Sequence, residues 1–183
     1  MAYEGGRQRV VLFGGYSFLP PQSKYFDDTW EWDGTEWTQI ADTGPSGRGL
    51  LPMIFDSSRE CLVLFGGYDG SVTLGDTWEW SEDAGWVERQ DMGPQSIVNP
   101  AMAYTEEHTV LHGFQSGDTG AGQTWEWDGR VWTQRQDMGP HARYAPALAY
   151  DSQRDRVVLF GGSGYVPPYG YLGDTWELEI IEQ

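Results

Sequence analysis

Two histidines and two arginines have side chains that could take part in a reaction. His112 lies inside an apolar segment, and His141 follows a Gly-Pro pair. The pKa of an imidazole lies close to neutral pH, so either ring could act as a general acid or base. Arg48 and Arg143 also follow Gly-Pro pairs, and a guanidinium there could hold an anionic ligand. The alternatives are a hydrogen-bonded core histidine at 112 and arginines tied to structural carboxylates.

Little in the sequence points to a metal or a cofactor. His108 and His112 would share one face of a strand but lie about 13 Å apart, too far for one metal ion. Asp118 lies in a glycine-rich turn without the companion acids that a calcium loop needs. No HExxH, CxxC, GxSxG, Walker or GxGxxG motif is present, and the single cysteine, Cys61, lies in an apolar segment typical of a core. We therefore expect no metal and no cofactor.

Aromatic side chains gather in two long loops, residues 16–27 and 163–173, and each loop contains a Pro-Pro pair. Proline stiffens a loop, and an ordered ring offers contact area at a low entropic cost. The loops therefore predict a site for a small molecule, a glycan or a peptide. The alternative is that the rings pack on each other and only order the loops. The candidate ligand-binding rings are Tyr16, Phe18, Tyr25, Tyr165, Tyr169 and Tyr171.

The overall charge excludes some partners. The 183 residues include 28 Asp and Glu against 11 Lys and Arg, a formal net charge of −17. Phosphate backbones and anionic lipids would repel such a chain, so we expect no nucleic acid and no membrane surface as partner. No stretch approaches 18 apolar residues, and Met1 begins no basic-then-apolar signal segment. A cytoplasmic location is favoured for the chain as given.

The elements that must position these residues come from an internal repeat. An apolar segment ending in glycine is followed each time by a segment that begins with Asp or Gln and contains tryptophan. The first tryptophans of the four copies are 48, 47 and 51 residues apart. The first segment is VVLFGG at 10–15 and 157–162, LVLFGG at 62–67 and a degraded VLHGF at 110–114. The second is DTWEW at 28–32 and 76–80, QTWEW at 123–127 and DTWEL at 174–178.

Each repeat predicts four short strands, which resemble PALAY, RVVLFGG, DTWEW and WTQ in turn. An Asp-Gly turn between the third and fourth strands is typical of a hairpin. The second strand is apolar at consecutive positions, which indicates burial on both faces, as in sheets packed radially as the blades of a propeller. The chain is thus predicted to be all-β and a single domain, 1–183. The repeats cover approximately 1–52, 53–100, 101–146 and 147–183.

These motifs resemble the kelch repeat family, whose repeats of about 50 residues form β-propeller blades. The resemblance implies a β-propeller of four kelch-type blades, with the last blade lacking its fourth strand because no WTQ segment follows DTWEL. Three arrangements are open: a closed ring of four blades, an assembly with a second copy through the open edge of the fourth blade, or a fragment. The protein would accordingly be a monomer or a homo-oligomer.

The resemblance also predicts where function lies. Kelch propellers bind ligands on the face that carries the loops between second and third strands and between fourth and first strands. In a closed ring, the loops of blades one and four would join their rings in one rim, with Arg48 and Arg143 nearby. A ligand-binding module is the leading hypothesis. The alternatives are a cofactor-free lyase, cyclase or isomerase that uses His112 or His141, and a structural assembly subunit.

Residues that recur in every repeat are expected to build the fold. The tryptophans of the third and fourth strands should form the core between blades. The aspartates that precede the third strand, Asp28, Asp76 and Asp174, should accept backbone N–H bonds. The glutamate of the third strand should pack in the blade or lie at its solvated edge; the alternative is a place in a central channel.

Overall fold

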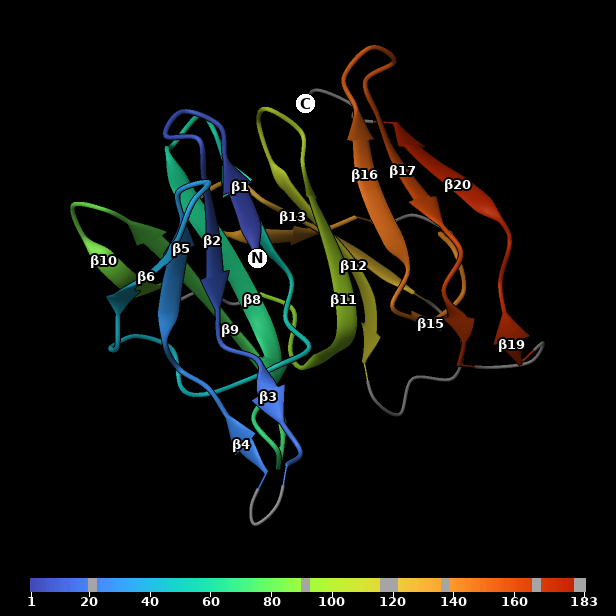
Figure 1. The fold of residues 1–183 in the computed structure, drawn as a ribbon. Helices are drawn as coiled ribbons and strands as arrows, with labels where there is room; N and C mark the ends of the chain where they lie inside the picture. Colours follow the sequence, from blue (N-terminus) through green and yellow to red (C-terminus); the bar gives the residue numbers. More distant parts are fainter. Residues whose placement is uncertain (20–22, 90–92, 116–121, 136–138, 166–168, 180–183) are drawn as a thin grey trace. The chain divides into compact units, whose positions relative to one another are not determined.

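A computed structural model describes residues 1–19, 23–89, 93–115, 122–135, 139–165 and 169–179. Within these residues every regular element is a β-strand, so no helix capable of crossing a membrane occurs there. The chain divides into two compact units, residues 1–91 and 92–183 (Figure 1). Each unit contains two of the predicted repeats, and each is described by itself.

The unit of residues 1–91 contains two four-stranded antiparallel sheets in which neighbours in sequence are neighbours in space. Sheet one is made of β1 (Ala2–Glu4), β2 (Arg9–Phe13), β5 (Thr29–Trp32) and β6 (Trp37–Ala41). Sheet two is made of β7 (Met53–Asp56), β8 (Cys61–Tyr68), β9 (Thr73–Ser81) and β10 (Gly85–Arg89). A short hairpin, β3 (Tyr16–Ser17) and β4 (Lys24–Tyr25), lies between β2 and β5 in the chain. Figure 1 shows it beyond the ends of these two strands.

The unit of residues 92–183 repeats this plan with one difference. Sheet three is made of β11 (Ile97–Tyr104), β12 (Thr109–Gln115), β13 (Gln123–Trp127) and β14 (Trp132–Gln134). Sheet four has three strands among the described residues: β16 (Ala147–Asp151), β17 (Arg156–Phe160) and β20 (Thr175–Glu179). A small sheet joins β15 (Arg143–Tyr144), β18 (Ser163–Gly164) and β19 (Gly170–Tyr171).

Strand register shows which residues of the four sheets are equivalent. The leucine of the second strand lies opposite the first tryptophan of the third strand in every sheet. These pairs are Leu12 and Trp30, Leu64 and Trp78, Leu111 and Trp125, and Leu159 and Trp176. The next pairs are Phe13 and Thr29, Phe65 and Thr77, His112 and Thr124, and Phe160 and Thr175. His112 therefore occupies a position that is phenylalanine in the other three sheets.

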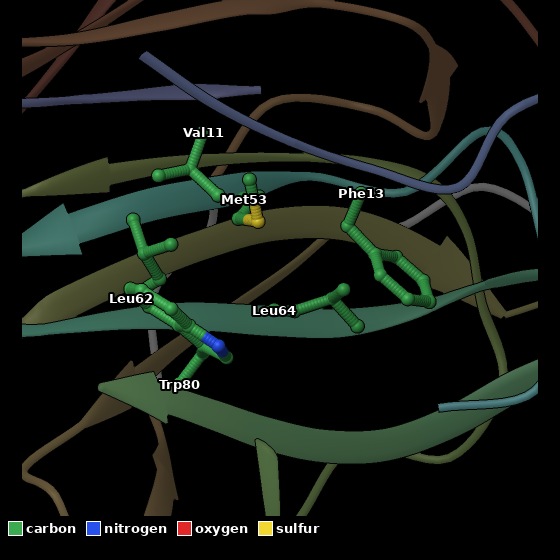
Figure 2. Close-up of a cluster of buried hydrophobic side chains, with 6 residues drawn as sticks. All are labelled: Val11, Phe13, Met53, Leu62, Leu64 and Trp80. Atoms are coloured by element: carbon green, nitrogen blue, oxygen red, sulfur yellow. The ribbon is translucent and has the colours of Figure 1, made fainter. Parts of the chain in front are cut away.

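Each unit has an apolar core in which side chains of its two larger sheets pack together. In residues 1–91 the buried cluster contains Val11 and Phe13 of sheet one and Met53, Leu62, Leu64 and Trp80 of sheet two. Figure 2 shows these side chains directed toward one another from both sheets. In residues 92–183 the buried cluster is smaller and contains Ala103, Val110 and Val157. Each large side chain that is buried in this way contributes about 1.5–3 kcal/mol to stability.

The predicted burial of the second strand on both faces is confirmed for sheets two and three. Seven successive residues of β8, beginning at Cys61, are buried, as are six successive residues of β12. Burial raises the pKa of the Cys61 thiol to about 12, which leaves that thiol protonated and unreactive at neutral pH. The paired glycines that end this strand hold a tight bend, because Gly14 and Gly15 have φ values of 64° and 114°.

Candidate functional site

The two candidate arginines are buried, and each is bonded to an aspartate and to a glycine carbonyl at one end of a neighbouring sheet. Arg48 is 2% exposed and donates hydrogen bonds to Oδ1 of Asp76 at 2.6 Å and to the carbonyl of Gly66 at 3.1 Å. Arg143 is 1% exposed and makes the same contacts with Oδ1 of Asp174 at 2.7 Å and with a glycine carbonyl, at residue 161, at 2.9 Å. These contacts agree with the alternative stated from the sequence, in which each arginine is paired with a structural carboxylate and does not hold a ligand.

The hydrogen bonds from Arg143 hold the pKa of Asp174 far below its usual range. The carboxylate of this ion pair therefore stays ionised at every pH at which the fold is ordinarily studied.

Sheet three replaces both members of this ion pair. Ile97 follows its Gly-Pro pair at the same distance as Arg48 and Arg143 do, and it is fully buried. Gln123 stands where the other sheets have aspartate. A buried arginine without its carboxylate is strongly destabilising, so the two changes compensate each other. The arginine and the aspartate therefore behave as one structural unit.

A group of four rings lies on the unit of residues 1–91, and we call it the ring cluster. It contains Tyr16, Phe18, Tyr25 and Tyr68. The centroid of the Tyr16 ring lies 4.7 Å from that of Phe18 and 5.9 Å from that of Tyr25, and Tyr25 lies 6.0 Å from Tyr68. Pairing of β3 with β4 sets Tyr16 directly opposite Tyr25. The structure thus brings together the three candidates of the first loop and adds Tyr68.

In the ring cluster, some rings pack against backbone while others are largely exposed to solvent. A Cβ atom on Gly49 would lie 2.5 Å from Cδ1 of Tyr16, and one on Gly70 would lie 2.7 Å from Cε2 of Tyr25. These rings therefore rest directly on glycine backbone. Tyr16 is 44% exposed and Phe18 is 67% exposed, so part of each side chain is open to a ligand. Leu19 beside them is 75% exposed.

The candidate rings of the other unit are arranged differently. Tyr165 stacks on the buried Phe114 with centroids 4.6 Å apart and meets Tyr144 edge to face at 5.6 Å. This packing is that of a ring which orders its loop. Tyr169 and Tyr171 are 75% and 98% exposed. The rim that would combine rings of both units stays a prediction. The Pro-Pro pairs at 20–21 and 167–168, and Asp118, lie outside the described residues.

His112 is a buried, neutral histidine. Its side chain is 2% exposed, and its Nδ1 lies 3.0 Å from Oγ1 of Thr124. Burial, with a smaller effect of the Arg143 charge, lowers its pKa to about 4. Its Nε2 is buried and has no hydrogen-bond partner among the described residues. The ring is therefore a neutral hydrogen-bonding group at physiological pH and a weak base.

His141 is exposed, and its backbone carbonyl accepts a hydrogen bond from Nε of Arg143 at 3.2 Å. Within the described residues, no group of three or more His, Cys, Asp or Glu side chains could hold a metal ion. His112 and His141 therefore stay candidate acid–base residues, and no metal site among the described residues includes them.

A cavity of about 220 Å³ lies between sheets three and four. Its wall is mainly apolar, with His112 and Thr124 as polar groups on one side and Glu177 on the other. The remaining lining residues are Val110, Gly139, Pro140, Leu148, Val157, Leu159, Trp176 and Leu178. The cavity is larger than the engineered cavity of about 150 Å³ that binds benzene, so a bicyclic ring is a reasonable occupant by volume.

Two repeated contacts were missed by reasoning from the sequence. The residue that precedes the Thr-Trp pair of the third strand accepts the indole N–H of that tryptophan. The distance is 2.8 Å from Nε1 of Trp30 to Asp28 and 2.7 Å from Nε1 of Trp78 to Asp76. Asp76 also accepts a hydrogen bond from Arg48, and backbone N–H donors to Asp28 and Asp76 stay a prediction. The same contact joins Trp176 to Asp174 and Trp125 to Gln123.

The glutamate of the third strand forms the second repeated contact. Glu79 is 3% exposed and pairs with Arg59 and with Arg89, whose Nη2 lies 2.6 Å away. Glu126 pairs with Arg135 at 3.0 Å. These pairs match the prediction that the glutamates pack within their sheets. Their partners could not be named from the sequence, because each arginine lies in a different strand or turn.

Comparisons with known proteins add no family to these observations. No protein-family model matches the chain, and no curated protein matches its sequence. Any assignment of function therefore has to rest on the residues and contacts described above.

Proposed function

We propose that the protein is a ligand-binding module of the kelch-propeller type and that its ring cluster binds a neutral glycan. One observation carries the proposal: Tyr16 and Phe18 are partly exposed aromatic side chains on a hairpin in which the Tyr16 ring rests against the backbone of Gly49. Rings that are already ordered lose little entropy when a ligand binds. The negative face of an aromatic ring attracts the C–H groups of a pyranose.

Charge favours a neutral ligand over an acidic one. An acidic peptide would need a free cation near the rings, and the buried Arg48 is already bonded to Asp76, Gly66 and Ser46. The net charge of −17 repels anions in general. Lys24 lies over the ring of Phe26 at 4.8 Å, so its ammonium group is also engaged. A neutral sugar avoids these costs.

The enzyme hypothesis has one observation in its favour, the unpartnered Nε2 of His112 beside a cavity. Its pKa of about 4 makes this imidazole a poor base at neutral pH. The Nδ1 partner is a threonine hydroxyl rather than a carboxylate. Loss of turnover of a screened substrate in His112→Phe, with the fold retained, would be needed to raise this alternative above binding.

The binding proposal is tested by titrating neutral oligosaccharides into the wild type and into matched variants. A panel of cello-, xylo-, manno- and chito-oligosaccharides covers the common pyranose geometries. We expect Tyr16→Ala and Phe18→Ala each to weaken binding by roughly 10-fold or more, in the range of an aromatic hot spot. Tyr3→Ala is the control, since Tyr3 is 58% exposed on the same unit but outside the ring cluster.

Two outcomes would contradict the binding proposal. The first is that no member of the panel binds the wild type. The second is that Tyr3→Ala weakens binding as much as Tyr16→Ala does. A large loss of thermal stability in Phe18→Ala would favour the alternative that these rings only order the loop.

The propeller part of the proposal is that the four sheets are kelch-type blades, the last with three strands. The meander order of the sheets and the fourfold register support it. Light scattering after gel filtration tests whether one chain suffices. A mass near 20.6 kDa agrees with a ring that one chain closes, and a multiple of that mass agrees with assembly through the open edge.

A further inference from the structure

We infer that the cavity between sheets three and four receives the tryptophan side chain of a partner polypeptide, which adds to the edge of β20 as a fourth strand. The inference rests on a comparison of the two units and is independent of the ring cluster. Among the described residues, β20 is the last strand of its sheet, and its Trp176 is 38% exposed (Figure 1). The equivalent Trp78 lies beside β10, which completes sheet two.

The walls of the cavity have counterparts in residues 1–91. The register equates Val110, His112 and Thr124 with Val11, Phe13 and Thr29. For sheet four, the register gives four further equivalent pairs: Leu148 and Met53, Val157 and Leu62, Leu159 and Leu64, and Leu178 and Trp80. Gly139-Pro140 corresponds to Gly44-Pro45. Six of these counterparts are the buried cluster of Figure 2.

In residues 1–91 the corresponding space is occupied by Trp86 of β10. This indole packs on the buried cluster and meets the ring of Phe13 edge to face at 5.1 Å. Its Nε1 donates a hydrogen bond to Oγ1 of Thr29 at 2.8 Å. A Cβ on Gly44 would lie 2.5 Å from Cδ1 of Trp86, so the glycine of the Gly-Pro pair makes room for the indole. The cavity of the other unit has these walls without the indole.

The polar groups of the cavity suit an incoming indole N–H. If the hydroxyl of Thr124 donates to Nδ1 of the neutral His112, its lone pairs stay open to accept a hydrogen bond. This arrangement places the proton of His112 on Nε2, the buried atom without a partner among the described residues. The incoming indole N–H would thus find an acceptor on Thr124.

The edge of β20 also selects a positive charge. Arg89 follows Trp86 by three residues and pairs with Glu79, and Arg135 follows Trp132 by three residues and pairs with Glu126. Glu177 is the equivalent glutamate of sheet four, and its side chain is 42% exposed with Arg154 as partner. An arginine three residues after the tryptophan would reach Glu177 in the same way.

The occupant is therefore a partner polypeptide with a Trp-x-x-Arg segment in extended form. A second copy of this chain is a poorer candidate, because its fourth-strand tryptophans lie in strands that are already paired in their own sheets; these are Trp37, Trp86 and Trp132. Strand addition supplies backbone hydrogen bonds along β20, and the pocket for one side chain supplies specificity. The antiparallel register of β10 on β9 would set the tryptophan opposite Leu178.

The first experiment uses a capped peptide with the sequence of Ala84–Arg89, AGWVER, titrated into the full chain. We expect saturable binding, with shifts of β20 amides and protection of those amides from hydrogen exchange. Replacing the peptide's tryptophan by alanine should weaken binding by roughly 10-fold or more. Replacing its arginine by glutamate should weaken binding to the wild type and restore it to Glu177→Lys, which tests the predicted contact directly.

A second experiment removes the dependence on peptide affinity. The same segment is fused after Gln183 through a flexible Gly-Ser linker, which raises its effective concentration and lets its tryptophan reach the position opposite Leu178. We expect the midpoint of thermal unfolding to rise by roughly 5–10 °C relative to the fusion whose tryptophan is replaced by alanine.

Three outcomes would overturn the inference. One is that the tryptophan and alanine fusions melt at the same temperature. Another is that N-acetyl-tryptophanamide fills the cavity as tightly as the peptide, which would indicate a small-molecule pocket without strand addition. The third is that the wild type forms a dimer in which β20 is protected without any peptide, which would make a second copy the occupant.

Discussion

Nε1 of Trp86 donates a hydrogen bond of 2.8 Å to Oγ1 of Thr29, and this bond joins the fourth strand of sheet two to the third strand of sheet one. The residues lie 57 positions apart in the chain. Thr124, the counterpart of Thr29, is bonded to His112 instead. The two units therefore differ at this contact between neighbouring sheets, which we call the joint. An indole fills it in residues 1–91, whereas among the described residues of 92–183 it is open.

Removal of the indole at 86 should reproduce the open joint in the first unit. Trp86→Ala creates a cavity next to Phe13, and we expect it to lower the free energy of unfolding by about 3–5 kcal/mol. Thr29→Val removes only the hydrogen bond and should cost about 1–3 kcal/mol, because the indole N–H is left unpaired. Urea denaturation measures both values. Equal losses in the two variants would show that the hydrogen bond, rather than the packing, holds the joint.

Arg48 and Asp76 should behave as a coupled pair in a double-mutant cycle. Asp76→Gln leaves a buried guanidinium without its counter-charge, and we expect a loss of roughly 3 kcal/mol or more. Arg48→Ile with Asp76→Gln copies the Ile97 and Gln123 of sheet three and should cost less than the sum of the single changes. The measurement is again urea denaturation. Additive costs would mean that the ion pair is not a unit and that Arg48 has another task.

His112 should make the stability of the fold depend on pH. Its pKa is about 4 in the folded chain and 6.5 in the absence of burial, so the unfolded chain binds more protons between these values. The contribution of the neutral ring is fully present above pH 6.5 and is lost as the pH falls toward 4. Between pH 7 and pH 5 the wild type should lose about 2 kcal/mol more than His112→Phe. The measurement is the free energy of unfolding of both proteins as a function of pH. If it changes with pH by the same amount in the wild type and in His112→Phe, His112 is exposed to solvent in the folded chain.

A single methyl group should disturb the ring cluster without removing a ring. Gly49→Ala places a Cβ 2.5 Å from Cδ1 of Tyr16, so the ring has to move. We expect weaker oligosaccharide binding, by roughly 3-fold or more, since an aromatic contact contributes about 0.5–1.5 kcal/mol. Gly34→Ala is a control for the substitution itself, because a Cβ at that position would have no atom within 4 Å, although its φ of 100° adds local strain. Unchanged affinity in Gly49→Ala would mean that the position of Tyr16 does not matter.

Much of the fold was predictable because each strand has a recognisable sequence pattern of its own. The apolar segment that ends in two glycines and the DTWEW segment both form strands where the repeat predicts them, at β8 and β9 for example. Their pairing follows from the order of the segments, since short turns join antiparallel neighbours. The bend at Gly14 and Gly15 was equally local, because the left-handed backbone there requires glycine.

The site was less predictable because its contacts join distant residues. Arg48 finds its carboxylate 28 positions away, so the sequence left open whether this arginine is structural or holds a ligand. Tyr68 belongs to a strand of sheet two, and only the fold brings it to Tyr25. The missing WTQ segment of the last repeat was visible in the sequence, but only the structure shows that the indole of Trp86 fills the space that is a cavity beside His112 in the other unit.

The most direct test of the proposed function is to locate a bound oligosaccharide by aromatic ¹H–¹³C NMR. The panel member that binds most tightly is titrated into the wild type, with ring signals assigned from single Tyr and Phe variants. We predict that the ring signals of Tyr16 and Phe18 shift in a saturable manner while those of Tyr3 do not. Shifts confined to Tyr169 and Tyr171, or no saturable shift of any ring, would contradict the account.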